Sequence, residues 1–440
     1  MLTFGTDGIR GRYGSELTNE DAATLGACAA EFLGSRRVII GVDTRESGAV
    51  LAAALAHGMR RSGCSVEYVG VAPTPSIAVL ARLHDTAAAV VTASHNPWFD
   101  NGIKLFSRGG RKLGDEQQRG IERALVAATP SGVTEFASLV SSADVSLDAY
   151  ERHVASAVAA DALAGMKIVV DCANGAMSDV APRVLRVLGA ECTVIHAAPD
   201  GRNINDRCGA THPGDLAGRV VATGAEIGIA FDGDGDRLIA VDHRGSVVDG
   251  DRLIALAALD LASRGELRNS GVVVTTMTNL GFHDAMRAAG VDVVVTAVGD
   301  RAVAAALEER DLVLGGEQSG HIIHRLHSEA GDGLLSAVMV LELVRRSGRP
   351  LAELADAVMS SYPQVLRNVR VATKPRDVEA TIAGQLAVER AALGDRGRIV
   401  VRASGTEPVV RVMVEAPDES TARTCADRIV DLVERAFSVV

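Results

Sequence analysis

Three aspartates alternate with glycines in the segment "FDGDGDR", residues 231–237. At this spacing the carboxylates of Asp232, Asp234 and Asp236 repel one another strongly unless a cation lies among them. Glycine tolerates the tight backbone that turns all three side chains to one side. Because carboxylate oxygens are hard ligands, the segment predicts a site for Mg²⁺ or Ca²⁺.

An EF-hand calcium loop is the first alternative, and the sequence departs from it twice. With Asp232 as the first position, Arg237 stands where the loop needs its glycine, and His243 stands where it needs its glutamate. A solvated acidic turn is the second alternative. Mg²⁺ is favoured because it leaves coordination places for a phosphate oxygen, and the adjacent arginine could hold another oxygen.

Ser94 follows the apolar run "AAAVVTA", residues 87–93, and precedes His-Asn-Pro. Sites in α/β proteins form just past the carboxyl ends of strands. The surroundings do not suit a serine hydrolase, because no G-x-S-x-G motif is present and the side chain of adjacent His95 should diverge from the serine. A turn serine and a serine that carries a phosphoryl group remain, and the full string up to Lys104 favours the second.

A third polar loop, "GGEQSGH", covers residues 315–321. It presents a carboxylate, an amide and a hydroxyl between glycines, which suits sugar hydroxyls or an amine. A plain turn is an equal alternative for this string alone.

The fourth loop, "RASGTEPVVR", covers residues 402–411. Its backbone N–H groups, two hydroxyls and two guanidinium groups could form a phosphate cradle, and a hairpin with surface arginines is the alternative. The N-terminal string "FGTDGIRGRYG" is glycine-rich but lacks the G-x-G-x-x-G spacing of a dinucleotide loop, and its Arg10 is a candidate phosphate contact.

A repeated pattern of strand, polar loop, helix, glycine and strand must position these loops. It occurs three times, over residues 36–70, 166–196 and 271–299. Gly63, Gly189 and Gly290 stand where a helix C-terminus is capped, and each is followed by a Val-rich run typical of a buried strand. The pattern predicts a βαβ unit in three related α/β domains with mixed or parallel sheets.

The last eighty residues differ from this pattern. Residues 397–416 read as strand, loop and strand, and residues 418–437 read as one amphipathic helix with Ser or Thr at its N-cap. These features predict a smaller α+β domain. For 440 residues we expect several domains, with boundaries at 1–150, 151–250, 251–362 and 363–440.

Composition limits the classes of partner. A net charge of −11 and an aromatic content of 3% argue against binding to nucleic acid or to a membrane surface. None of the six cysteines forms a C-x-x-C pair, so neither a zinc site nor a disulfide framework is expected. With no apolar leader and no long uncharged apolar segment, we expect a cytoplasmic protein with reduced thiols.

Four strings of this sequence together resemble the signature loops of the α-D-phosphohexomutase family. In the family's order they are "TASHNPWFDNGIK", "FDGDGDR", "GGEQSGH" and "RASGTEP". The resemblance covers essentially the whole chain and implies three α/β domains and a smaller fourth one around a central cleft. It implies phosphorylation of Ser94 and one Mg²⁺ per chain, held by the three aspartates and the Ser94 phosphate. The implied catalytic residues are Ser94, Lys104, His321, His95 and Arg237.

The opening "FGTDGIRG" and the form "GGEQSGH" are most similar to the branch of the family that acts on glucosamine phosphates. The resemblance implies reversible conversion of glucosamine 6-phosphate to glucosamine 1-phosphate through a bisphosphate, which would feed UDP-N-acetylglucosamine and cell-wall synthesis. A sugar bisphosphate is a candidate activator. Implied substrate contacts are Glu317, Ser319, Arg402, Ser404, Gly405, Thr406, Arg411 and Arg10.

Alternatives remain at the level of substrate and reaction. Mannose and glucose phosphates are the nearest alternative substrates; a metal-dependent phosphatase and a non-catalytic phosphosugar sensor are more distant readings. Ala302 stands where relatives often carry an aromatic residue, which leaves that loop's part in substrate binding open. We expect a small phosphosugar as the partner of a monomer or homodimer.

Overall fold

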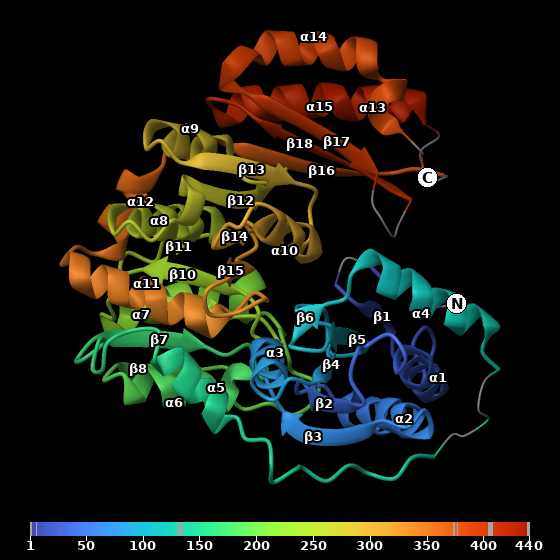
Figure 1. The fold of residues 1–440 in the computed structure, drawn as a ribbon. Helices are drawn as coiled ribbons and strands as arrows, with labels where there is room; N and C mark the ends of the chain where they lie inside the picture. Colours follow the sequence, from blue (N-terminus) through green and yellow to red (C-terminus); the bar gives the residue numbers. More distant parts are fainter. Residues whose placement is uncertain are drawn as a thin grey trace.

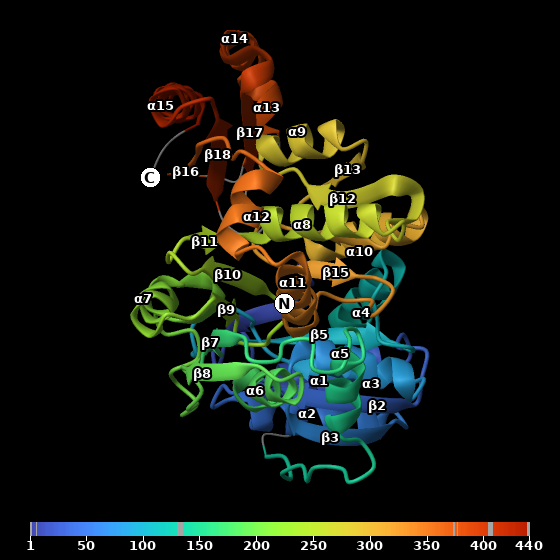
Figure 2. The same cartoon turned by 90° about the vertical axis from the view of Figure 1, so that its left-hand side faces the viewer.

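The computed structural model describes residues 2–5, 7–129, 132, 135–372, 375, 377–403 and 408–437. The chain forms four sheets, each with its own helices, which we call the first to the fourth unit in chain order. The fourth unit lies on the third, at the opposite end of the molecule from the first, in both views (Figures 1 and 2).

The first unit has the strand order β1-β5-β4-β2-β3, with β6 on the outside of β5. β2, β3 and β4 are parallel, whereas β5 runs antiparallel to β4 and to β1. Alternate side chains of β2 and β4 pack against α1 and α2 on one face and α3 on the other. The elements are β1 (Ile9–Arg12), α1 (Asn19–Ala29), β2 (Arg37–Val42), α2 (Gly48–Arg61), β3 (Ser65–Val71), α3 (Thr74–Leu83), β4 (Ala87–Val91), β5 (Asp100–Ser107), β6 (Arg111–Lys112) and α4 (Asp115–Ala127).

The second unit has the order β11-β10-β9-β7-β8, and the third has the order β13-β12-β14-β15. The second contains α5 (Asp148–Ala155), β7 (Lys167–Asp171), α6 (Met177–Val187), β8 (Glu191–Ile195), α7 (Gly214–Thr223), β9 (Ile227–Phe231), β10 (Leu238–Asp242) and β11 (Val247–Val248). The third contains α8 (Gly250–Ser263), β12 (Gly271–Thr275), α9 (Leu280–Ala288), β13 (Asp292–Thr296), α10 (Asp300–Glu309), β14 (Leu314–Gly316), β15 (Ile322–His324), α11 (Gly333–Ser347) and α12 (Leu351–Val358).

The predicted βαβ repeat is confirmed in all three of these units. The parallel pairs β2–β3, β7–β8 and β12–β13 are each joined by one helix: α2, α6 or α9. Gly63, Gly189 and Gly290 follow the helices with φ of +83°, +91° and +69°. This left-handed conformation ends each helix and is readily adopted only by glycine, which is why the glycine recurs.

The fourth unit is an antiparallel sheet of order β16-β18-β17, covered by helices. It confirms the predicted α+β character, but the predicted Ser or Thr N-cap of the last helix is wrong. Asp418 caps α15 and accepts a hydrogen bond from Thr421 N, and its charge also suits a helix N-terminus. The elements are β16 (Gln364–Arg370), α13 (Val378–Thr381), α14 (Ala383–Leu393), β17 (Arg398–Ala403), β18 (Val409–Glu415) and α15 (Glu419–Ala436).

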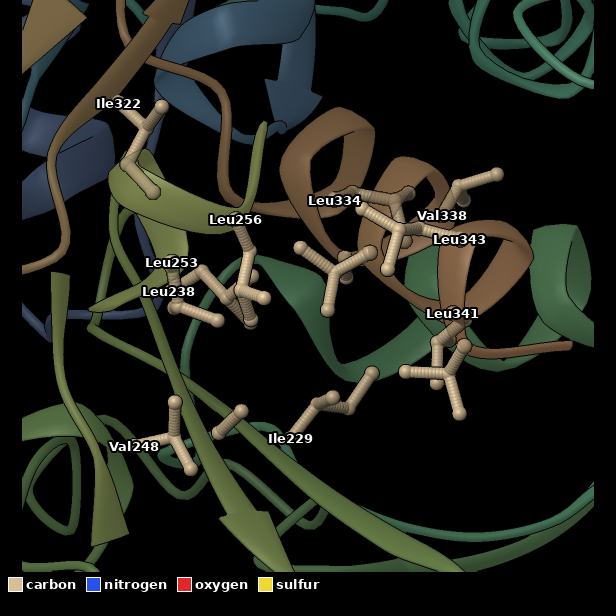
Figure 3. Packing of buried hydrophobic residues seen from close by; sticks show 14 of the residues in the cluster. Ile229, Leu238, Val248, Leu253, Leu256, Ile322, Leu334, Val338, Leu341 and Leu343 are labelled. Atoms are coloured by element: carbon tan, nitrogen blue, oxygen red, sulfur yellow. The ribbon is translucent and has the colours of Figure 1, made fainter. Parts of the chain in front are cut away.

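The second and third units share one hydrophobic core (Figure 3). Ile229, Leu238 and Val248 of the second unit pack in the same cluster as Leu253 and Leu334 of the third. The fourth unit has its own cluster, and the first has two, although Val79 of α3 packs in the shared core and Ala330 of the third unit packs against α3 and the first sheet. The middle two units therefore form one body, to which the other two attach. None of the helices in the described residues has the length and apolarity needed to cross a membrane.

Candidate active site

Ser94 lies in the turn after β4 and is completely buried. Its φ of +53° is rare for a residue with a side chain, so the surrounding structure must hold it there. Its backbone N–H donates to Thr92 Oγ1 at 2.8 Å, and its hydroxyl donates to Asp232 Oδ2 at 2.5 Å. The serine loop of the first unit thus meets the aspartate loop of the second, which the turn-residue alternative does not require.

Arg45 follows β2, is 3% exposed and binds the serine loop within the first unit. Its guanidinium pairs with Asp43 at 2.8 Å, and Asp43 in turn accepts a 2.7 Å bond from the Thr92 hydroxyl. The same guanidinium donates to four carbonyl oxygens of the loop, those of Ser94, Asn96, Pro97 and Asp100. A buried charge engaged in this way fixes the loop. Sequence analysis missed it, although a D-x-R pair directly after a buried strand was a visible signal.

Asn205 holds the same loop from the second unit. Its side-chain Nδ2 donates to the carbonyls of Ser94 at 2.9 Å and Asn96 at 3.1 Å. Gly233 leaves room for this arrangement, because a Cβ there would lie 2.7 Å from the Ser94 carbonyl oxygen. One reason for the alternating glycines is therefore clearance for the neighbouring loop.

The three aspartates of the aspartate loop are buried, and each offers an oxygen within 4.8 Å of the others. Burial raises the pKa of Asp232, and the charges of Asp236 and Asp234 raise it further. The Oδ1 atoms of Asp234 and Asp236 are buried without a hydrogen-bond partner among the described residues. Clustered carboxylates with unpartnered oxygens fit a hard divalent cation such as Mg²⁺.

Lys104 of β5 lies against the same cluster. Its Nζ donates to Asp234 Oδ2 and to Asp236 Oδ2, both at 2.8 Å. Burial alone would lower the pKa of this ammonium, but the adjacent carboxylates raise it well above its ordinary value. The lysine is therefore charged, and it supplies part of the positive charge that the cluster needs.

Asp7, Lys112 and Asp300 extend these charges toward the third unit, and sequence analysis missed all three. Asp7 pairs with Lys104 at 2.8 Å, with Arg10, and with Lys112 at 3.5 Å. Lys112 also contacts the Asp300 carboxylate at the start of α10. These residues stand singly in the sequence, so no spacing marked them, and only the fold brings them together.

A cavity of about 300 Å³ opens beside the aspartate loop. Three units line it: Asp7, Arg10 and His95 from the first, Asp236 and Arg237 from the second, and Asp300, Glu317, Ser319 and His321 from the third. Leu238 N donates to Gly320 O at 2.9 Å, which ties the "GGEQSGH" loop directly to the aspartate loop. A cavity of about 320 Å³ between α8 and α11 contains none of the predicted site residues.

Buried His321 and partly buried Arg237 line the cavity of about 300 Å³. Burial lowers the pKa of His321, and its Nε2 lies 3.8 Å from Asp300 Oδ2. Arg237 Nε lies 3.9 Å from Asp232 Oδ2 and is buried without a hydrogen-bond partner among the described residues. A guanidinium held beside the carboxylates, with a donor to spare, can bind an oxygen of an anionic ligand.

Arg402 and Arg411 of the fourth unit stand directly opposite each other in the β17–β18 register. Burial lowers the pKa of half-buried Arg402, and the Arg411 charge lowers it further. Like charges in this position are destabilising unless an anion neutralises them. Neither arginine lines the cavity. Arg402 is nevertheless close enough to Glu317 for that negative charge to offset part of the lowering of its pKa. Ser404, Gly405 and Thr406 lie outside the described residues.

Comparison with known proteins identifies the chain's family. Models described as phosphoglucomutase/phosphomannomutase domains I, II, III and IV match residues 1–130, 148–245, 249–362 and 366–432. The chain belongs to the phosphoglucomutase/phosphomannomutase family. This family is the one that the four loop strings resembled.

Relatives in the family match over nearly their full length. Phosphoglucosamine mutase of Frankia casuarinae is 47% identical over 450 residues, which is 99% of this chain and 98% of the relative. Phosphoglucosamine mutase of Rubrobacter xylanophilus is 48% identical over 444 residues, which is 99% of this chain and 97% of the relative.

Solved structures of the phosphoglucomutase/phosphomannomutase family share the four-domain fold. A family protein from Burkholderia thailandensis superposes with a TM-score of 0.80 at 25% identity, over 99% of this chain and 98% of that one. The Aspergillus fumigatus N-acetylphosphoglucosamine mutase, solved with GlcNAc-6P and magnesium, gives a TM-score of 0.70 at 18% identity, over 100% and 96%. The predicted fold class is thereby confirmed.

Proposed function

We propose that this member of the phosphoglucomutase/phosphomannomutase family is a mutase that interconverts glucosamine 6-phosphate and glucosamine 1-phosphate. The observation that carries the proposal is the contact between the buried Ser94 hydroxyl and Asp232, beside the cavity that three units line. The full-length likeness to phosphoglucosamine mutases favours the amino sugar over mannose or glucose phosphates.

In the proposed cycle Ser94 carries a phosphoryl group before substrate arrives. The bond from phosphorus to Ser94 Oγ breaks, and a bond from phosphorus to the free sugar hydroxyl forms, which gives a bisphosphate. After the bisphosphate turns end for end, the bond from its other phosphorus to sugar O6 breaks and a bond from that phosphorus to Ser94 Oγ forms, which regenerates the phosphoserine and leaves glucosamine 1-phosphate. A Mg²⁺ ion held by Asp232, Asp234, Asp236 and the Ser94 phosphate would stabilise the charge on the transferring group.

The proposed proton carriers are His321, which lines the cavity, and Lys104, which lies behind it against Asp234 and Asp236. His321 is neutral near pH 7 because burial lowers its pKa, so its free nitrogen can accept the proton of the attacking sugar hydroxyl. Lys104 is held as an ammonium by carboxylates and can return a proton to the serine oxygen as it leaves. Arg237 and His95 at the cavity edge then orient the phosphoryl oxygens.

We assign binding of the sugar to the third unit and binding of the distal phosphate to the fourth. Glu317 and Ser319 reach the cavity and suit the hydroxyls or the ammonium of the sugar. Arg402 and Arg411, with Ser404, Gly405 and Thr406, would bind the phosphate that is not reacting, and the opposed arginines supply the charge for it. On this assignment the domains are 1–150, 151–250, 251–362 and 363–440.

The direct test asks whether Ser94 is phosphorylated and whether turnover requires it. Intact-mass analysis of the purified chain should show an increment of one phosphate that is absent from Ser94→Ala, and that variant should lose mutase turnover. Ser76→Ala, which alters a buried serine of the same unit, is the matched control and should keep both properties. Turnover close to wild type in Ser94→Ala would overturn the proposal.

Substrate preference is tested separately. The values of kcat/KM for glucosamine, mannose and glucose 6-phosphates should rank the amino sugar first. A higher value for mannose or glucose phosphate would assign the chain to the alternative branch, and release of free phosphate in place of isomer would indicate a phosphatase.

A further inference from the structure

A second cluster of metal-ligand side chains lies in the second unit, apart from the three aspartates. Asp171 ends β7, His196 follows β8, and Cys208 lies in the loop before α7. One ligand atom from each lies within 4.8 Å of the others. The cysteine spacing of the sequence gave no sign of this cluster, because its members come from three separate segments.

The three side chains are largely buried. Asp171 and Cys208 are completely buried, and the His196 side chain is 27% exposed. His196 Nδ1 lies 3.1 Å from Asp171 Oδ2, yet it is buried without a partner in hydrogen-bond geometry among the described residues. At this separation the nitrogen and the carboxylate oxygen pair with each other when no metal is bound, and both are close enough to ligate one ion.

The remaining contacts are those that a metal site needs around its ligands. His196 Nε2 lies 3.2 Å from Asp215 Oδ2, and a carboxylate on the second ring nitrogen is typical of metal-bound histidines. Asp171 accepts backbone N–H bonds at 2.9 Å from both Ala173 and Gly209, which fix its orientation. Asn174 Nδ2 lies 4.0 Å from the Cys208 sulfur.

Several non-glycine residues around the cluster have a left-handed backbone conformation, which is energetically unfavourable for them. Five of the eleven non-glycine residues with positive φ among the described residues lie in these three segments: Ala173, Asn174, His196, Asn205 and Arg207. Such residues persist only where the surrounding structure over-determines them. Asn205 N donates to Ala173 O at 2.9 Å, and the Asn205 side chain then reaches the carbonyl of Ser94. The cluster thus lies directly behind the serine loop.

We propose that Asp171, His196 and Cys208 bind a second divalent cation of the zinc class, which braces the 203–209 loop against the serine loop. One nitrogen, one sulfur and one oxygen ligand suit a borderline-soft ion better than Mg²⁺, and three ligands leave one position for water. The thiol is not placed to act as a nucleophile, because it is completely buried. The inference does not depend on the proposed mutase activity.

Cobalt(II) is the probe, because a thiolate bound to cobalt gives a charge-transfer absorption that oxygen ligands do not. Protein stripped with a chelator, kept reduced with a phosphine and saturated with Mg²⁺ is titrated with Co²⁺. We expect a thiolate band that saturates at one equivalent. Cys208→Ser should remove it, and His196→Gln should weaken Co²⁺ binding about 10- to 100-fold.

Matched variants separate this site from the rest of the chain. Cys64→Ser, a buried cysteine of the first unit, should keep the band, and so should Asp232→Asn, which damages only the aspartate loop. As a second measurement, Zn²⁺ should raise the Tm of wild type more than that of Cys208→Ser. Folded wild type that gives no thiolate band, or a band that survives in Cys208→Ser, would overturn the inference.

Discussion

The two ends of the candidate site are built in opposite ways. At the serine end, a buried hydroxyl, buried carboxylates and a buried lysine are fixed by bonds that cross between units. At the other end, Arg402 and Arg411 lie half-buried and exposed on a strand pair of a unit with its own separate core. Bond making needs atoms held within a fraction of an ångström. In the proposed cycle the sugar turns around, so the group that binds its distal phosphate has to accept that phosphate in either orientation of the sugar.

The junctions of the outer units show the same difference. The first unit is joined to the second by short bonds at the aspartate loop, such as the one that Thr74 Oγ1 donates to Asp234 Oδ2 at 2.6 Å. The fourth unit is joined to the third beside the cavity-lining Met277, where Arg398 donates to Thr278 O and Gln364 Nε2 donates to Met277 O. The first junction contains the aspartate loop itself, whereas the second does not include Arg402 or Arg411.

Loss of one carboxylate at the serine end should have the largest effect. We expect Asp234→Asn to lower kcat about 10³-fold at saturating Mg²⁺, because one anionic ligand and the partner of Lys104 are lost together. Steady-state kinetics with Asp356→Asn, an exposed control, would check this. A kcat reduced by less than about tenfold would show that the aspartate loop is not the reacting centre.

Arg45→Lys should have the next largest effect. The ammonium cannot reach four carbonyls at once, so the serine should be misplaced and kcat should fall about 10²-fold while KM changes little. Arg37→Lys, at a part-exposed ion pair of the same unit, is the control. A change in Tm with no change in kcat would reduce Arg45 to a purely structural role.

At the end of the site that the fourth unit forms, Arg402→Gln should act mainly on substrate binding. We expect KM to rise about tenfold, with kcat changed far less, because one charge-assisted contact to the distal phosphate is lost. The ligand-free variant should be no less stable than wild type, since the opposed charges are relieved. Arg370→Gln on β16, at the opposite edge of the same sheet, is the control, and a fall in kcat at unchanged KM would contradict the division between the ends.

The smallest effect concerns pH at the junction of the third and fourth units. Burial raises the pKa of Asp251, whose carboxylate accepts Asn279 N, to about 7. The folded chain therefore binds this proton more tightly than the unfolded chain, so the contribution of Asp251 to stability is full below about pH 4 and is lost as pH rises toward and through 7. Asp251→Asn should avoid this loss and melt about 2–4 °C higher than wild type at pH 8, with no gain at pH 4. Thermal melts across this range check it, and a difference independent of pH would contradict it.

The sequence was sufficient wherever a local pattern carried the information. The βαβ repeat, its capping glycines and the aspartate loop each lie within a continuous stretch. Residues that act singly from distant segments were missed: Arg45, Asp7, Asp300 and Asn205 bond to partners that only the fold brings near. The α15 N-cap was missed for a local reason, since Asp418 competes with nearby Ser and Thr and brings a charge that the helix end favours.

Because Ser94 comes from one unit and Asp232 from another, neither half is chemically competent alone. A chain that has folded only its first sheet during synthesis presents a serine with no carboxylates beside it. A bulkier residue at Gly233 would push the two loops apart. On the proposed cycle, the phosphoryl donor is therefore complete only after both units have folded against each other.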